Sequence, residues 1–215
     1  MKISVTDLAL VSECKRCFWY AVRGVKRPQI FPSILKSLDE LIKLDVTRRT
    51  RNRERLSFTQ GGVVVTGVNK RMMLAHSGGT LVGVIDELVK FRDGYKVIDY
   101  KVSANAYTRE KADHYYGVQM SAYALLCEEN GYEPVTRADL VFYVPVEMVS
   151  GVVTFEIVVV PMTITIHRVE TLLQNAREIG MMSTPPEDGG DCKWCRYVKS
   201  RSREGIENKE EVTDG

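Results

Sequence analysis

Two Cys-x-x-Cys pairs near opposite ends of the chain constrain its fold more than any other feature. Cys14 and Cys17 lie close to the amino terminus, and Cys192 and Cys195 lie close to the carboxyl terminus. Two such pairs complete a four-sulfur site that suits Zn²⁺ or an iron–sulfur cluster, because both accept four thiolates. If all four sulfurs meet, the terminal segments lie side by side and a very long loop is closed. The alternatives are unrelated pairs or buried apolar cysteines, and the identical spacing argues against both.

The composition is that of an ordinary globular protein. The chain has 215 residues, of which 44% are hydrophobic and 27% charged, and a formal net charge of +2. This charge permits a nucleic-acid partner without indicating one. The amino terminus lacks the apolar core of a secretory signal, and no uncharged apolar run is long enough to cross a bilayer. We therefore expect a cytoplasmic protein without a membrane partner, in which reduced cysteine pairs bind metal.

Apolar periodicity and turn signals predict a mixed α/β domain over residues 1–202. We expect helices over residues 5–22, 33–47, 112–129 and 165–179, and strands over residues 63–65, 72–74, 81–91, 95–102, 140–144 and 152–160. Asp93-Gly94 predicts a hairpin turn, because this dipeptide tolerates positive φ. The charged segment 203–215 has almost nothing to bury, which predicts a disordered tail. The fifth cysteine, Cys127, is expected in the core.

Two carboxylates and a lysine stand on the predicted hairpin. Asp86 and Asp99 fall opposite one another, close enough to share a hard cation through oxygen ligands. Lys101 lies two residues after Asp99 and projects from the same face of its strand. A bound Mg²⁺ or Mn²⁺ would lower the pKa of a water molecule, and the lysine could orient that water or stabilise a pentacovalent phosphorus. The arrangement suits phosphodiester hydrolysis.

The alternative is a pair of solvated strand carboxylates with a surface salt bridge, which composition alone favours. Against it, Asp99 and Lys101 interrupt the otherwise apolar stretch 97–102. Charges placed there cost desolvation free energy unless the protein uses them.

The segment from Gly83 to Lys101 resembles the catalytic core of RecB-like nucleases of the PD-(D/E)XK superfamily. Gly83-x-x-Asp86 followed by Asp99-x-Lys101 is similar to their G-x-x-D…(D/E)-x-K pattern. The resemblance covers most of residues 3–197. It implies an α/β fold with a restriction-endonuclease-like core, in which helices flank a mixed central β-sheet. In this chain the four-cysteine site would join the terminal segments.

A Q-x-x-x-Y pattern downstream agrees with the same family. Gln119 and Tyr123 lie four residues apart on a predicted helix and therefore share one of its faces. Alone, such a pair is common and is typical of an ordinary helix with a buried tyrosine. Its order and spacing match the family, in which this face lies near the active site, so the resemblance implies that both residues position the substrate.

The resemblance also implies roles for the hairpin residues and an activity. Asp86, Asp99 and the backbone carbonyl of Tyr100 would bind Mg²⁺ or Mn²⁺, and Lys101 would be the catalytic lysine. The implied substrate is DNA that is single-stranded or has free ends. DNA repair and CRISPR-type processing, with protein partners from either machinery, are both compatible with this activity.

One family feature is missing from the sequence. Many relatives carry a metal-binding histidine on the helix before the sheet, but no histidine lies between Phe31 and Thr47. Asp39 is the nearest substitute in kind, and a solvent-facing helix carboxylate is the alternative interpretation of it. His76 is a weaker candidate, because it lies on a predicted strand or its turn.

The four cysteines fit the family as well. Several RecB-like nucleases hold an iron–sulfur cluster with cysteines on both sides of the nuclease core. Residues 14–20 resemble their amino-terminal C-P-x-x-F-Y element, with lysine in place of proline. The resemblance therefore implies a [4Fe–4S] or [2Fe–2S] cluster. The relatives usually divide their cysteines one and three, whereas this chain has two and two, so Zn²⁺ is kept as the alternative.

A run of arginines follows the second predicted helix, at positions Arg48, Arg49, Arg51, Arg53 and Arg55. Guanidinium groups suit phosphate contacts, and a solvated charged connector is the alternative.

Two rival functions are compatible with parts of the sequence. A nucleic-acid-binding module without catalysis would explain the missing helix histidine. A thiol or cluster redox protein would use the cysteine pairs, but it leaves Asp86, Asp99 and Lys101 unexplained.

Overall fold

The computed structural model describes residues 1–28, 32–65, 71–76 and 79–210, and the side chains among them except those of residues 71, 76 and 202–210. The helices are α1 (Val5–Glu13), α2 (Lys15–Ala21), α3 (Ser33–Arg51), the 3-10 helix η1 (Ser57–Thr59), α4 (Arg109–Glu128), α5 (Ile166–Met181) and α6 (Lys193–Glu210). The strands are β1 (Lys2–Ser4), β2 (Val63–Val64), β3 (Arg71–His76), β4 (Gly79–Val84), β5 (Glu87–Phe91), β6 (Gly94–Val102), β7 (Val135–Val149) and β8 (Val152–Pro161).

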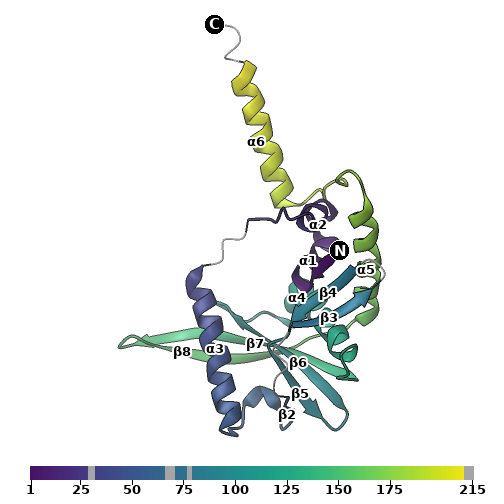
Figure 1. Cartoon of the computed structure of the whole chain (residues 1–215). Coiled ribbons are helices and arrows are strands. Elements are labelled where there is room, and N and C mark those ends of the chain that lie inside the picture. The colour runs from purple at the N-terminus through teal and green to yellow at the C-terminus, as the bar shows by residue number, and fades with distance from the viewer. Residues whose placement is uncertain (29–31, 66–70, 77–78, 211–215) are drawn as a thin grey trace.

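The strands form two sheets. The larger has the order β2-β5-β6-β7-β8, in which β6 and β7 are parallel and the other neighbours are antiparallel. The smaller has the order β1-β4-β3, with β1 parallel to β4. Helices cover both faces of the larger sheet (Figure 1). The expected mixed α/β fold, with helices around a mixed sheet, is confirmed.

Strand β6 lies at the centre of the larger sheet and is buried on both faces. Val97 belongs to the core that α1, α4 and α5 build on one face. Ile98 and Tyr100 belong to the core under α3 on the other face, together with Ile42 of that helix. Full burial of an aliphatic side chain such as Ile98 contributes about 1.5–3 kcal/mol to stability. The strand that carries the candidate catalytic residues is therefore held from both sides.

The predicted hairpin is present between β5 and β6. Phe91 pairs with Gly94 and Glu87 pairs with Ile98, which places Asp86 just beyond the ladder and opposite Asp99. Gly94 has a φ of 133°, which explains the glycine at this turn.

The expected single strand over residues 81–91 is wrong. The chain leaves the smaller sheet after Val84 and enters the larger one at Glu87, so this segment forms β4 and β5. The backbone bends at Asp86, whose carboxylate accepts a hydrogen bond from the Tyr100 N–H at 2.9 Å. The Asp86 carboxylate thus accepts the Tyr100 N–H in place of a backbone carbonyl, which a longer β5 would have supplied.

Three helices differ from the expected ranges. The segment 5–22 is two helices, because Cys14 is extended, with φ −163° and ψ 104°, between α1 and α2. Helix α3 continues to Arg51, so the expected connector after residue 47 begins as a helix. Helix α6 continues to Glu210, into the segment expected to be a disordered tail, and residues 211–215 lie outside the described residues. Figure 1 shows α6 projecting away from the rest of the molecule.

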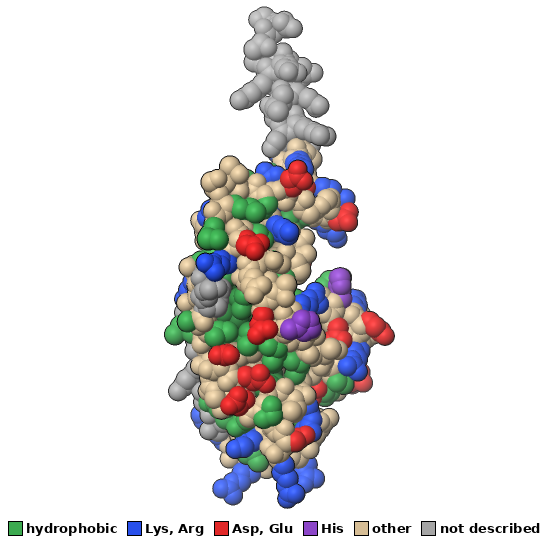
Figure 2. Space-filling model, turned by 90° about the vertical axis from the view of Figure 1, so that its right-hand side faces the viewer, with side chains coloured by type: hydrophobic (Ala, Val, Ile, Leu, Met, Phe, Trp, Pro, Cys, Tyr) green, Lys and Arg blue, Asp and Glu red, His purple; other side chains and the backbone are tan. Residues whose placement is uncertain are grey.

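Among the described residues, no helix combines the length and the apolar character needed to cross a bilayer. On the face shown in Figure 2, charged side chains of both signs are interspersed with apolar ones, and basic side chains gather at the end opposite α6.

Candidate active site

Strand β6 presents Asp99 and Lys101 on one face, two residues apart. Asp99 is 3% exposed. Its Oδ2 forms a close ion pair with the Lys101 ammonium, and its Oδ1 accepts a hydrogen bond from Gln119 Nε2 at 3.1 Å. A buried carboxylate is thus held between a strand lysine and a helix amide.

Asp86 reaches the same region from the bend before β5. Its Oδ2 accepts the Tyr100 N–H at 2.9 Å. The N–H and C=O of one strand residue point to the same side, so the Tyr100 carbonyl also faces Asp86 beyond the end of the ladder. The carboxylates of Asp86 and Asp99 and this carbonyl form an oxygen donor set that fits a hard divalent cation.

Helix α3 supplies two more charged groups. The Lys43 ammonium lies 2.8 Å from Asp39 Oδ2 and 2.8 Å from Asp86 Oδ1. Asp39 therefore lies near Asp86, with the Lys43 ammonium between the two carboxylates. Sequence reasoning missed Lys43, although its i,i+4 spacing from Asp39 placed both on one helix face. The side chain of His76 lies outside the described residues.

Helix α4 completes the site from the other direction. Gln119 Nε2 donates to the Tyr123 hydroxyl at 3.2 Å as well as to Asp99. Tyr116, one turn earlier on α4, places its ring centroid 4.9 Å from the Lys101 ammonium. Sequence reasoning missed Tyr116, and its i,i+3 spacing from Gln119 was the available signal.

All these side chains line one open cavity of about 490 Å³. Its lining comprises the acidic and amide groups, two lysines, tyrosines and a few apolar residues: Leu35, Asp39, Lys43, Val84, Asp86, Asp99, Tyr100, Lys101, Val102, Tyr116, Gln119 and Tyr123. The structure therefore brings together every residue expected at the carboxylate–lysine site.

Burial shapes the electrostatics of this cavity. It raises the pKa of Asp99 to about 6, against the lowering effect of the Lys101 charge. It also raises the pKa of Glu87 to about 7, although the Tyr100 hydroxyl donates to that carboxylate at 3.4 Å. Burial acts to lower the pKa of Lys101, but the charge and hydrogen bond of Asp99, together with smaller effects of Tyr116 and Asp86, outweigh it and the pKa is raised. The site thus concentrates acidic groups that a cation would stabilise in their charged form.

The four paired cysteines meet at a separate centre between α2 and α6. The Sγ atoms of Cys14 and Cys195 are 3.7 Å apart, those of Cys17 and Cys192 are 3.6 Å apart, and those of Cys17 and Cys195 are 3.7 Å apart. All four sulfurs lie within 4.8 Å of one another, so they could hold a metal. The terminal segments are therefore joined as the two pairs predicted.

The surroundings act differently on these thiols: burial raises the pKa of Cys17 and of Cys195, whereas the pKa of Cys14 is lowered. Burial acts to raise the pKa of Cys14, but hydrogen bonds from the backbone of Gly189 and Cys17 outweigh it and lower the value to about 7. Arg27 donates from Nη2 to Cys192 Sγ at 3.5 Å. Cys127, in contrast, is fully buried in the core on α4, where burial raises its pKa to about 12.

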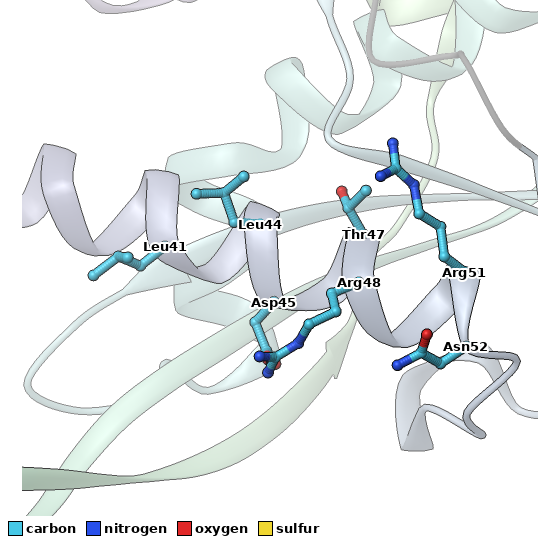
Figure 3. A pocket seen from close by; sticks show the side chains of 7 residues that line it. All are labelled: Leu41, Leu44, Asp45, Thr47, Arg48, Arg51 and Asn52. Atoms are coloured by element: carbon cyan, nitrogen blue, oxygen red, sulfur yellow. The ribbon is translucent and has the colours of Figure 1, made fainter.

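The arginine run divides into paired and unpaired side chains. Arg48 contacts Asp45 at 2.6 Å, and Arg49 contacts Glu54 at 3.1 Å. Figure 3 shows Arg48 beside Asp45, while Arg51 extends from another side of α3. Asp45, Arg48 and Arg51 line an open cavity of about 610 Å³, together with the exposed side chains of Leu41 and Leu44.

One family model and several solved structures match the chain. The model of the PD-(D/E)XK nuclease superfamily matches residues 33–200. No curated protein matches the chain. A solved structure of an Eubacterium rectale protein named as a candidate exonuclease is similar at 12% identity with a TM-score of 0.52, over 91% of this chain and 87% of that one. The structure of SSO0001 is similar at 18% identity with a TM-score of 0.46, over 92% and 84% of the respective chains.

Proposed function

The chain belongs to the PD-(D/E)XK nuclease superfamily, and from that membership we propose that it is a Mg²⁺- or Mn²⁺-dependent deoxyribonuclease. Its substrate would be single-stranded or free-ended DNA, as in repair or CRISPR-type processing. One observation carries the proposal: Asp86, Asp99 and Lys101 converge on a cavity that also holds the α4 pair Gln119 and Tyr123. Superfamily membership itself implies a nucleic-acid substrate.

Two carboxylates and one backbone carbonyl would bind the cation. Asp86 would offer a carboxylate from the bend before β5, Asp99 would offer one from β6, and the Tyr100 carbonyl would offer a neutral ligand. When bound, Mg²⁺ or Mn²⁺ supplies an activated water and neutralises charge on the phosphate. Asp39 is paired with Lys43, and it would add a further carboxylate to the cation site if the Lys43 side chain moved away.

Lys101 is suited to stabilise charge and not to remove a proton. Its ammonium is held beside Asp99, and the raised pKa keeps it protonated at neutral pH. A fixed positive donor can orient the attacking water and offset the charge of a pentacovalent phosphorus.

Gln119 acts as a positioning residue in this proposal. Its single Nε2 group donates both to Asp99 and to the Tyr123 hydroxyl, so it fixes the carboxylate against α4. Tyr123 lines the same cavity, where a nucleotide would lie.

Three arginines are the best candidates for contacts to the DNA backbone. In the described part of the chain, no ion pair engages Arg51, Arg53 or Arg55, which leaves their exposed guanidinium groups available to phosphates.

The test is cleavage of end-labelled single- and double-stranded DNA with Mn²⁺ by the wild type, Lys101→Ala and the exposed-lysine control Lys90→Ala. The proposal is supported if the wild type and Lys90→Ala cleave the DNA and Lys101→Ala does not. The ladder of labelled products would then give the polarity of cleavage. Full cleavage by Lys101→Ala would rule out the assigned centre.

A non-catalytic DNA-binding module is the second candidate, favoured by one observation. Lys43 places a positive charge beside Asp86, where the helix histidine of relatives would face a metal. Tight DNA binding by folded, Mn²⁺-supplied protein without any turnover would establish this function instead.

A further inference from the structure

The sulfur atoms of the four-cysteine centre are arranged in a way that distinguishes one ion from a cluster. Three close contacts connect all four sulfurs in a chain, from Cys14 to Cys195, from Cys195 to Cys17 and from Cys17 to Cys192, at 3.7, 3.7 and 3.6 Å. Every remaining pair is within 4.8 Å. Cys17 and Cys195 thus each take part in two close contacts.

The three close contacts fit a single tetrahedral ion, and the remaining pairs lie within 4.8 Å. Four thiolates at metal–sulfur bonds of ~2.3 Å are separated from one another by about 3.8 Å, and every pair is close because every pair shares the ion. The three measured contacts agree with that separation.

An iron–sulfur cluster requires a different arrangement. In a two-iron cluster only thiolates on the same iron are close, so two close pairs cannot share a sulfur, yet Cys17 and Cys195 are each shared here. In a four-iron cluster each thiolate has its own iron, and bridging sulfides separate the irons. Its four cysteine sulfurs therefore lie farther apart than two ligands on one ion.

We propose that Cys14, Cys17, Cys192 and Cys195 hold one tetrahedral Zn²⁺ ion and no iron–sulfur cluster. This departs from the cluster that the family resemblance implied. Four protein ligands close the site, which is the form of structural zinc centres.

The surroundings fit such a structural role. Four thiolates on Zn²⁺ carry a net charge of −2, and Arg27 donates to Cys192 while it also pairs with Glu13 at 2.7 Å. The ion would fasten α2 to the start of α6, so its binding free energy would contribute to folding.

The test measures metal, sulfide and colour in the full-length protein purified anaerobically from cells supplied with both zinc and iron. We expect one zinc per chain, no acid-labile sulfide and no visible absorption. Two or four irons with matching sulfide would overturn the proposal, and one iron without sulfide would overturn the assignment to zinc. Replacement by Co²⁺ is expected to give the visible bands of a tetrahedral thiolate site, and octahedral bands would contradict it.

Variants test whether these cysteines bind the ion, and zinc content is measured independently of nuclease activity. Cys195→Ser is expected to lose the zinc and to melt at a lower temperature, whereas the buried control Cys127→Ala keeps it. Because the carboxylate site could also take zinc, the count is repeated with Asp99→Ala, which is expected to retain one ion. Full zinc content in Cys195→Ser, or loss of zinc in Asp99→Ala alone, would place the ion elsewhere.

Discussion

The Lys43 ammonium on α3 lies 2.8 Å from the Asp86 carboxylate and 2.8 Å from Asp39, so it occupies the side of Asp86 that faces the helix. Burial acts to lower the pKa of Lys43, but its hydrogen bonds to the two carboxylates outweigh it and the pKa is raised. The lysine is therefore a charged competitor for any divalent cation that uses Asp86 from this side.

Removing this competitor should ease metal binding. Lys43→Ala is expected to lower the Mn²⁺ concentration for half-maximal cleavage roughly two- to five-fold, because an ion pair as exposed as this one is worth at most about 1 kcal/mol. The lysine side chain is 42% exposed, which sets that upper bound. Mn²⁺ titration of the cleavage rate measures the effect.

Lys36→Ala is the matched control, since Lys36 also lies on α3 but pairs only weakly with Glu40, at 3.9 Å in solvent. A higher Mn²⁺ requirement in Lys43→Ala would show that the lysine supports the cation site instead of competing with it.

The geometry of the hairpin could be predicted because local residues determine it. A tight turn at Asp93-Gly94 fixes the pairing register, and the two-residue period of a strand then places Asp99 opposite Asp86. The meeting of the cysteine pairs was predictable for a similar reason, since each pair brings two thiolates to one point.

The contacts of Lys43 could not be predicted, because they depend on how α3 packs over the sheet. The passage of the chain from the smaller to the larger sheet at Asp86 could not be predicted for another reason. Both β4 and β5 have buried residues, so the apolar pattern of residues 81–91 predicts one continuous strand. The extended conformation of Cys14 between α1 and α2 was likewise invisible to helical periodicity.

Gln119 should affect turnover more than DNA binding. Gln119→Ala removes the hydrogen bond that fixes Asp99 against α4 and the hydrogen bond from Gln119 to the Tyr123 hydroxyl. We expect the cleavage rate to fall roughly ten- to a hundred-fold through misplacement of the Asp99 carboxylate. Tyr123→Phe removes only the hydroxyl and should cost less. Single-turnover rates and DNA affinity are measured side by side, with Tyr115→Phe as the exposed control on the same helix. A loss confined to DNA affinity would contradict the positioning role.

Breaking the buried ion pair between Lys96 and Asp139 should strongly destabilise the protein. Lys96 is fully buried and lies 2.7 Å from Asp139 Oδ2, while it also donates to the Phe58 carbonyl at 2.6 Å. Asp139→Ala leaves the ammonium without its counter-charge, which is expected to lower the free energy of unfolding by about 3–5 kcal/mol. Urea denaturation measures the change. Glu40→Ala, which breaks an exposed pair, should cost less than about 1 kcal/mol, and equal losses in the two variants would refute the assignment.

Gly83 is required by packing, and two glycine-to-alanine exchanges can show this. A Cβ at Gly83 would lie 2.7 Å from Leu126 Cδ1 and 2.9 Å from Val5 Cγ2, so Gly83→Ala must displace core side chains of α4 and α1. We expect a loss of about 1–3 kcal/mol in the free energy of unfolding. Gly117→Ala on α4 meets nothing within 4 Å and should stabilise the protein by about 0.5–1 kcal/mol, because alanine favours the helix. Chemical denaturation of both variants decides the matter. If Gly83→Ala were as stable as the wild type, core packing would not require a glycine at position 83. The requirement would then have to come from contact with the substrate.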